Sequence, residues 1–352
     1  MRRSSTTIVI VISLVLLAGL ATAATGCGPA TQGAGLSSGD LSPEDILAKA
    51  FAASQEMSSA KGSFELQVSF DSDLAQVPEE EQALLAQPIK VSGTLGYDSD
   101  PRAGDVVIGV SAAGQTMEMG LRLLGDKAWI RFMDQWYETP PEMQQILAAP
   151  TDSGAGMADV GQLLADLGVD PLSWLKNLRL VGEEVIDGAG VYHLTATPDI
   201  GTMMTDVVEL MQSGELMKLV DPTGAAGDLM GSSASLPSAG ELEDMQRQLA
   251  EMFQDIAVDV WVAKDGFAPL RFSAAAHVTP PPGEDAGGVG AIDISATVSL
   301  LDINQPVSVE PPASAKPWTE LEKAMEENPG MFMGPFFGSA FGSAPAAPGT
   351  YQ

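Results

Sequence analysis

Few side chains of this chain could take part in covalent or metal chemistry. Its only cysteine is Cys27, and its only histidines are His193 and His277. A single cysteine cannot form a disulfide framework, and this set of residues cannot supply a zinc site built from Cys and His. Both histidines lie inside alternating segments of strand type, on the polar side or at an edge, and nothing beside them indicates a catalytic triad. We interpret them as ordinary strand residues.

The short motifs of hydrolases, calcium-binding proteins and nucleotide-binding proteins do not fit either. Gly109-Val110-Ser111-Ala112-Ala113 lacks the final glycine of the turn that exposes a serine nucleophile. Two Asp-Ser-Asp runs, 71–73 and 98–100, depart from the calcium loop because Ala75 and Arg102 take the next ligand positions. The sequence has no glycine loop for phosphate and no dinucleotide fingerprint. It therefore predicts a protein that is not an enzyme, with no catalytic residue, no metal ligand and no cofactor.

The charge of the chain argues against nucleic acid as a partner. Its 352 residues include 17 Lys and Arg against 47 Asp and Glu, which gives a formal net charge of -30. The acidic excess is spread along the chain, and no run of basic residues could neutralise phosphates. The length allows one or two domains, each with an ample hydrophobic core.

Cys27 is the one residue whose neighbours in sequence indicate a particular chemical modification. A cationic start at residues 1–3 is followed by an apolar run at 8–20, and small residues lead up to the cysteine. This order predicts a signal peptide at 1–26, because the apolar run is short for a membrane-spanning helix of about 20 residues. Ala24-Thr25-Gly26-Cys27 resembles the lipobox of bacterial lipoproteins, with Ala24 where leucine is usual. Ordinary cleavage near the alanines and a retained signal anchor are the alternatives.

The lipobox resemblance implies that diacylglycerol is attached to the thiol of Cys27 and that cleavage makes this residue the first of the mature chain, with its amine open to acylation. Two or more acyl chains give stable anchoring, whereas one alone is marginal. Residues 28–39 are rich in Gly, Ser, Ala and Thr, so we expect 27–40 to be a flexible tether of about 20 Å. The mature protein would then sit on the extracytoplasmic face of the cell membrane.

Residues 89–136 are the part around which the remaining elements are organised. Short alternating segments follow one another there with only turns between them. Residues 116–123 place large apolar side chains on one side, and residues 128–133 resume the alternation after a turn at 124–127. We predict consecutive antiparallel strands with one apolar face. More strands are predicted by the alternation at 64–70, 184–186, 191–197, 257–264, 270–278 and 292–300.

Helices are predicted between and beside these strands. The clearest is 42–57, where Ser42 is a capping residue and Pro43 opens the first turn. Shorter helices are predicted at 142–148, 158–167 and 171–178, and a Met-rich helical insertion at about 202–254 contains helices at 202–220 and 241–256. We expect one domain at 41–312, followed at 313–352 by a short helix and a disordered tail.

The apolar face of the predicted sheet has two interpretations. It is either the floor of a packed core or the lining of an incompletely closed cavity, in which methionine would adapt to acyl chains. Periodicity alone does not separate them. The candidate lining residues, one to three from each of several strands, are Phe64, Leu66, Val68, Met117, Met119, Leu121, Ile130, Phe132, Leu194, Val260, Phe272 and Ile294.

The order of several segments between residues 42 and 312 resembles the LppX/LprAFG-type lipoproteins of mycobacteria and, more distantly, the LolA/LolB carrier fold. After the lipobox and an Ala- and Ser-rich helix, the matching segments are Ser63-Phe64-Glu65-Leu66, Val91-Ser92-Gly93-Thr94-Leu95, Leu124-Gly125-Asp126-Lys127-Ala128-Trp129, Gln135-Trp136-Tyr137, Asp187-Gly188, Tyr192-His193-Leu194, Val258-Asp259-Val260-Trp261-Val262 and Val307-Ser308-Val309-Glu310-Pro311-Pro312. The insertion at about 202–254 is longer than the family pattern. Only Cys27 carries over as a motif residue.

This resemblance implies an α+β fold, a strongly curved and unclosed antiparallel β-sheet (a half-barrel) with helices covering its concave face. For some members it also implies a cavity that holds acyl chains. We therefore predict a membrane-anchored envelope lipoprotein that binds a lipid or other amphiphile and carries or presents it. The alternative is a sensor or scaffold of the same fold that binds an envelope protein and no lipid. A hydrolase is a more distant option, and it would require His193 or His277 beside a buried nucleophile.

Overall fold

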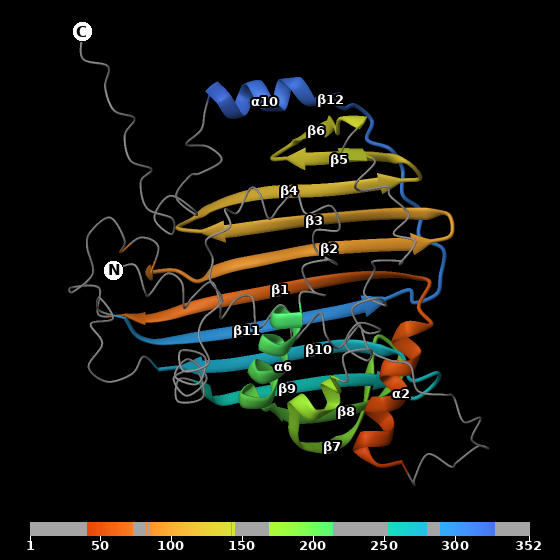
Figure 1. The fold of residues 1–352 in the computed structure, drawn as a ribbon, viewed down its shortest axis with the longest axis vertical. Helices are drawn as coiled ribbons and strands as arrows, with labels where there is room; N and C mark the ends of the chain where they lie inside the picture. Colours follow the sequence, from red (N-terminus) through yellow and green to blue (C-terminus); the bar gives the residue numbers. More distant parts are fainter. Residues whose placement is uncertain are drawn as a thin grey trace.

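The computed structural model describes residues 41–72, 82, 85–141, 143–144, 169–213, 253–279 and 289–327. These residues form an α+β fold built on one sheet of 12 strands in the order β12-β6-β5-β4-β3-β2-β1-β11-β10-β9-β8-β7 (Figure 1). All neighbouring strands are antiparallel except β12 and β6. The sheet is open, because its two outer strands, β12 and β7, are not paired with each other. The strands are β1 (Ser59–Ser72), β2 (Ile89–Ser99), β3 (Arg102–Ala112), β4 (Gln115–Leu124), β5 (Lys127–Phe132), β6 (Gln135–Glu138), β7 (Leu175–Ile186), β8 (Ala189–Pro198), β9 (Phe253–Ala263), β10 (Pro269–Val278), β11 (Val289–Leu301) and β12 (Lys316–Pro317).

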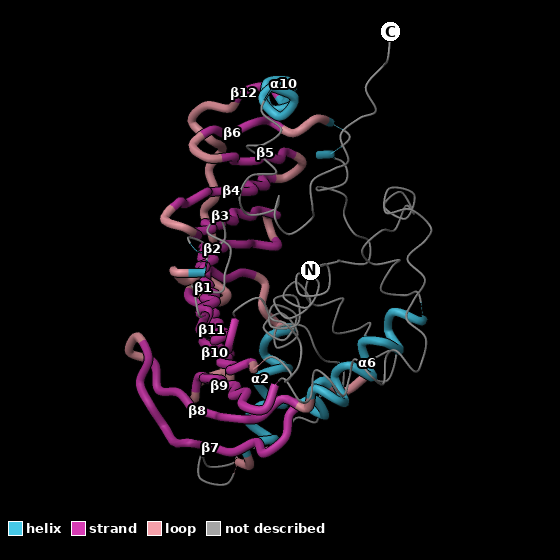
Figure 2. The backbone as a smooth tube through the Cα atoms, turned by 90° about the vertical axis from the view of Figure 1, so that its left-hand side faces the viewer, coloured by secondary structure: helices cyan, strands magenta, loops and turns pink. Residues whose placement is uncertain are grey.

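Three α-helices accompany the sheet within the described residues: α2 (Pro43–Gln55), α6 (Ile200–Ser213) and α10 (Trp318–Glu327), together with the short 3-10 helix η2 (Pro171–Trp174). Figure 2 shows the sheet edge-on, with β9, β8 and β7 turning toward the side on which α2 and α6 lie. The predicted curved and unclosed sheet with helices on its concave face is confirmed. None of the helices among the described residues has the length and apolar character needed to cross a membrane.

Helix α2 begins where the capping signals predict. The Ser42 hydroxyl accepts a hydrogen bond from the backbone N–H of Asp45 at 3.1 Å, and the Asp45 carboxylate accepts one from the backbone N–H of Ser42 at 3.2 Å. These hydrogen bonds from Ser42 hold the pKa of the Asp45 carboxyl below its ordinary value. The cap fixes the angle at which the helix enters, and the helix then packs on β7, β9 and β10.

The core consists of two clusters on the helix side of the sheet. In the first, Ile46 and Leu47 of α2 are 0% and 2% exposed and pack against apolar side chains of β8, β9 and β10. The second cluster joins β1, β10 and β11 through Leu66, Val68 and Ile294. Both arise from strict alternation along the strands, which sends every second side chain to this side.

Two helix predictions are wrong in part. The helix predicted at 171–178 ends at Trp174, because Leu175 and Lys176 pair with Pro198 and Thr197 of β8. The helix predicted at 241–256 is wrong over its last four residues, since β9 starts at Phe253 and pairs with the end of β10. In both places strand pairing overrides a local helical pattern. The rest of that second helix, the predicted helices at 142–148 (apart from residues 143–144) and 158–167, residues 1–40 and the tail after 327 lie outside the described residues.

After β11 the chain crosses the ends of the central strands before it adds β12 to β6 (Figure 1). The Asn304 side-chain carbonyl accepts a hydrogen bond from the backbone N–H of Ser58 at 2.8 Å, and the backbone N–H of Val307 donates to Asp98 at 3.1 Å. Further along, Arg122 donates to the backbone carbonyl of Glu310 at 2.9 Å. This crossing segment leads to the edge strand β12, and α10, which follows it, contacts β12 and β6.

Candidate functional site

The twelve candidate lining residues lie on one face of the sheet. The register shows this directly, because residues that stand opposite each other on neighbouring strands share a face. One row of opposed residues crosses nine strands, from β5 to β8 in the order of the sheet. This central apolar row consists of Phe132, Met119, Ile108, Gly93, Phe64, Val298, Phe272, Val260 and Leu194. The neighbouring rows hold the remaining candidates, so we call this side the apolar face.

The structure divides these candidates into a covered and a less covered group. Leu194, Val260 and Phe272 belong to the cluster beneath α2 and are at most 7% exposed. Leu66, Val68 and Ile294 are buried in the second cluster. The other six, on β1, β4 and β5, are only partly buried: Phe64, Met117, Met119, Leu121, Ile130 and Phe132. The apolar face is therefore well packed toward β8–β10 and at Leu66 and Val68 of β1, and it is more open across the rest of β1–β5.

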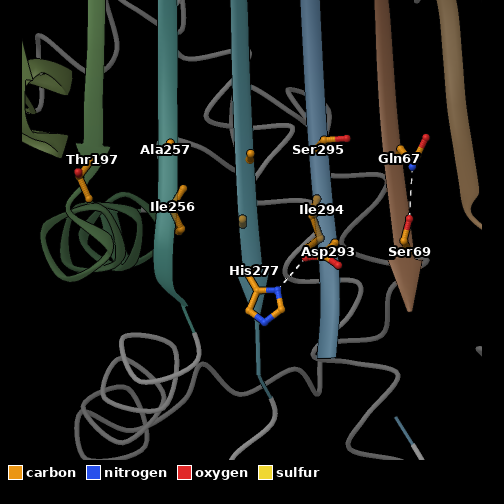
Figure 3. A pocket seen from close by; sticks show the side chains of 11 residues that line it. Gln67, Ser69, Thr197, Ile256, Ala257, His277, Asp293, Ile294 and Ser295 are labelled. Atoms are coloured by element: carbon orange, nitrogen blue, oxygen red, sulfur yellow. Dashed lines mark hydrogen bonds and ion pairs between the residues drawn. The ribbon is translucent and has the colours of Figure 1, made fainter. Parts of the chain in front are cut away.

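A pocket of about 530 Å³ lies on the opposite face of the sheet (Figure 3). Most of its lining side chains alternate with buried ones on β1, β8, β9, β10 and β11, and we call this side of the sheet the polar face. Its floor includes Ala257 and Ala275, which stand opposite each other. Its rim holds His277 Nδ1 at 2.7 Å from Asp293, and the Gln67 amide donates to the Ser69 hydroxyl at 3.3 Å. Apart from the buried Ile294, none of the twelve candidates lines it.

His193 lies elsewhere on this polar face, in a more elaborate arrangement. Its Nδ1 is 2.8 Å from Glu184 Oε1 on β7, and its Nε2 is 3.0 Å from Asp259 Oδ1 on β9. Its ring stacks on Trp261 with the ring centres 4.4 Å apart, and the Trp261 indole N–H donates to Glu184 at 3.1 Å. On the other side of the indole, Arg271 Cζ is 5.8 Å from the ring centre. We call these five residues the His193 cluster.

The cluster sets the charge state of one of its carboxylates. The hydrogen bonds from the Trp261 indole and then from His193 lower the pKa of Glu184, which outweighs a small opposing effect of burial. Glu184 therefore stays ionised in mildly acidic solution. Because both ring nitrogens of His193 face carboxylates, neither is directed at a hydroxyl or thiol that it could activate. This geometry does not support a hydrolase.

Sequence reasoning places both histidines on the polar face but finds none of their partners. Glu184 and Asp259 are 9 and 66 residues away from His193 in sequence, and only strand pairing brings them together. The alternation itself could show that His193 and Asp259 point to the same side, but not that β8 and β9 are neighbours. Among the described residues, no group of three or more His, Cys, Asp or Glu side chains is arranged to hold a metal ion.

No protein-family model matches the chain, and none of the curated proteins does. Among solved structures, the fold is similar to the lipoprotein LppX from Mycobacterium tuberculosis, with a TM-score of 0.34 and 16% identity over 76% of this chain and 98% of that one. LprF from Mycobacterium bovis gives a TM-score of 0.31 with 12% identity over 77% and 97% of the two chains. A DUF1329 family protein from Desulfovibrio piger gives 0.22 with 11% identity over 77% and 96%. The order of segments in the sequence predicts a resemblance to LppX/LprAFG-type lipoproteins, and solved structures of such lipoproteins are found to be similar in fold. This similarity concerns the fold alone.

Proposed function

We propose that the chain is a membrane-anchored envelope lipoprotein that binds a lipid or another amphiphile on its apolar face and carries or presents it. The observation that supports this most is the central apolar row, which is continuous across nine strands and only partly buried over β1–β5. Strands lie about 4.8 Å apart, so the four gaps between β1 and β5 span about 19 Å. That width is enough to lay a long acyl chain along the row.

The energy of such binding would come from removing apolar surface from water, at about 25 cal/mol per Å². Met117 and Met119 of β4 lie in this open half, and their unbranched thioether side chains adapt readily to chains of different shape. No charged partner is needed for this mode of binding.

Lipid binding is tested by native mass spectrometry of the full chain extracted from its own membrane in detergent. The wild type should show lipid adducts. Replacing both Met117 and Met119 by glutamine should lower the adduct fraction at least about tenfold, because each lost methylene or thioether contact costs about 0.8 kcal/mol of transfer free energy.

The matched control is Glu118→Gln, which lies between the two methionines and points to the polar face, where it pairs with Arg131 at 2.9 Å. It should keep the wild-type adduct fraction. Circular dichroism at the same temperature establishes that all variants are folded. Wild-type protein without adducts, or equal loss in both variants, would contradict lipid binding on this face.

We further propose that diacylglycerol on Cys27 anchors the protein. Cys27→Ser should move the protein from the membrane to the soluble extracytoplasmic fraction or leave it uncleaved, and the mass of the acyl groups should disappear. Ala24→Leu, which brings the motif to its usual form, is the control and should keep the protein in the membrane. A Cys27→Ser protein that is cleaved at the same site and stays in the membrane would refute the anchor.

The alternative of a sensor or scaffold that binds an envelope protein stays a prediction. It depends on the helical insertion, of which residues 214–252 lie outside the described residues. Within the described part, no feature favours it over lipid binding. Deletion of 202–254 followed by pull-down from envelope extracts separates the two, since only the sensor should lose its partner.

A further inference from the structure

Most of the large apolar side chains that stay exposed lie on one edge of the sheet. Among the described residues five such side chains are exposed, and three of them belong to the outermost strand β7: Leu180, Val181 and Val185, which are 40%, 54% and 73% exposed. We call these three residues the β7 patch. The other two, Met133 after β5 and Leu301 at the end of β11, lie apart from it. Exposed apolar side chains that gather on one edge indicate a contact surface.

The chain enters the described domain at this same edge. Leu41, the first described residue, packs against the first core cluster, as do Leu175 and Leu178 of β7. Figure 1 shows the beginning of α2 beside β7. Only residues 28–40 separate Leu41 from Cys27, and the flexible tether that the sequence predicts there reaches about 20 Å. With Cys27 in the anchor proposed above, β7 is the strand held nearest to the membrane.

The free edge of β7 is a poor template for another strand. Its pairing with β8 shifts register after Lys176 and again at Val181. A strand that is irregular in this way does not offer the regular row of N–H and C=O groups that an added strand needs. Contact with a lipid surface requires no such row, because apolar side chains can enter the headgroup region one by one. The β7 patch therefore fits a membrane surface better than a strand of a protein partner.

The charged side chains of β7 leave one cation free at this edge. Glu183 forms an ion pair with Lys264, and Glu184 belongs to the His193 cluster, so both carboxylates of the strand are engaged within the molecule. Lys176 is paired with a carboxylate that precedes α6. Arg179 is exposed and has no ion-pair partner among the described residues. A free guanidinium is suited to the phosphates of lipid headgroups.

We propose that the β7 edge docks on the lipid surface to which Cys27 anchors the chain, with the side chains of the β7 patch among the lipid headgroups. The inference rests on the anchor proposed above, and it adds which edge of the sheet faces the membrane. The sheet then stands on the membrane, with β12 and α10 at the far end (Figure 1).

This orientation places the open half of the apolar face away from the bilayer. In the order of the sheet, β1 is five strands and β5 nine strands from β7. At about 4.8 Å per strand, β1 and β5 lie up to about 24 and 43 Å from the docked edge. A lipid bound along the central apolar row would therefore be lifted clear of the bilayer on which the protein stands.

Fluorescence quenching on the full acylated chain in phosphatidylcholine vesicles tests this orientation. Acylation blocks the thiol of Cys27, the only natural cysteine, so Val185→Cys introduces the one free thiol for a dye. The dye should lose fluorescence when part of the phosphatidylcholine carries a spin-label quencher near its headgroup. Leu301→Cys, at another exposed apolar position, is the matched control, and its dye should keep its fluorescence.

Removal of the other side chains of the β7 patch measures the strength of the contact. In the chain labelled at position 185, Leu180→Ser with Val181→Ser should lower the ratio of docked to undocked molecules at least about tenfold, since each methylene no longer buried costs about fourfold. Met133→Ser with Leu301→Ser removes the two exposed apolar side chains outside this edge and should leave the quenching unchanged. Circular dichroism establishes that each variant is folded.

Equal quenching at positions 185 and 301, or full quenching at 185 in the variant with serine at 180 and 181, would overturn the docking edge. A dye at 185 that is shielded only at high protein concentration, and not quenched from the lipid, would also overturn it, because that result indicates a second copy of the chain. The same dye on the wild type checks the anchor separately. Uptake by the wild type would show that the thiol of Cys27 is free, which refutes the anchor itself.

Discussion

At Gly93 the central apolar row contains no side chain of its own. A Cβ atom at this position would lie 2.2 Å from the backbone oxygen of Val107 and 2.6 Å from Cζ of the Phe64 ring. The ring of Phe64, on the neighbouring strand, therefore fills the space that a side chain would take. This close approach keeps β1, β2 and β3 in contact at the centre of the apolar face.

Replacement of Gly93 by alanine should destabilise the fold by about 1–3 kcal/mol, because the new methyl group must displace the Phe64 ring and strain the backbone. Thermal unfolding of the full chain measures this. Gly109→Ala is the control, since a Cβ there would meet its nearest atom at 3.7 Å, an ordinary contact. Equal melting temperatures for the two variants would show that the space around Gly93 is not tight.

For single residues, the sequence predicted which side of the sheet a side chain occupies, but not which side chains it contacts. Alternation places Met119 and Phe132 on the same side, and pairing then sets them directly opposite each other. The partners of His193 were not predictable, because a histidine flanked by apolar residues looks the same whether its ring meets water or two carboxylates. That the candidates line a ligand site stays a prediction.

At the scale of elements, α2 is the helix that covers the core beneath β8–β10. Its predicted limits, 42–57, agree with Pro43–Gln55 because local signals alone determine them: a capping box, a first-turn proline and apolar residues at helical spacing. The β7 strand shows the opposite case. Two register shifts break its alternation, so the sequence pattern is not that of a regular strand, and only the tertiary pairing with β8 defines it.

Ile46 anchors α2, and it is 0% exposed. Ile46→Ala should lower the free energy of unfolding by about 2–5 kcal/mol, because it leaves a cavity between the helix and the sheet. Chemical denaturation with urea gives the value. Glu44→Gln, on the exposed side of the same helix, should change stability by less than about 0.5 kcal/mol. A small effect of Ile46→Ala would mean that α2 is not part of the cooperative core.

At the scale of the whole molecule, the sheet consists, apart from β12, of two sets of strands that are consecutive in sequence. β1 to β6 form one set and β7 to β11 the other, and in each set every strand pairs with the next one along the chain. Short turns join β2 to β6 in order as well as β7 to β8 and β9 to β10, so this local order was predictable in outline, whereas α6 lies between β8 and β9. The pairing of β1 with β11 was not predictable, since the alternating sequence of either strand does not identify a partner so far away in the chain.

The continuous apolar face forms only when β1 pairs with β11. Pairs of strands close in sequence within each set can form early in folding, whereas contacts between segments distant in sequence form slowly. Until β11 reaches β1, the molecule has two short apolar surfaces and no continuous one. A chain halted before β11 would expose one edge of β1, which would then be paired with β2 alone, so the last long strand of the chain also protects the first from aggregation.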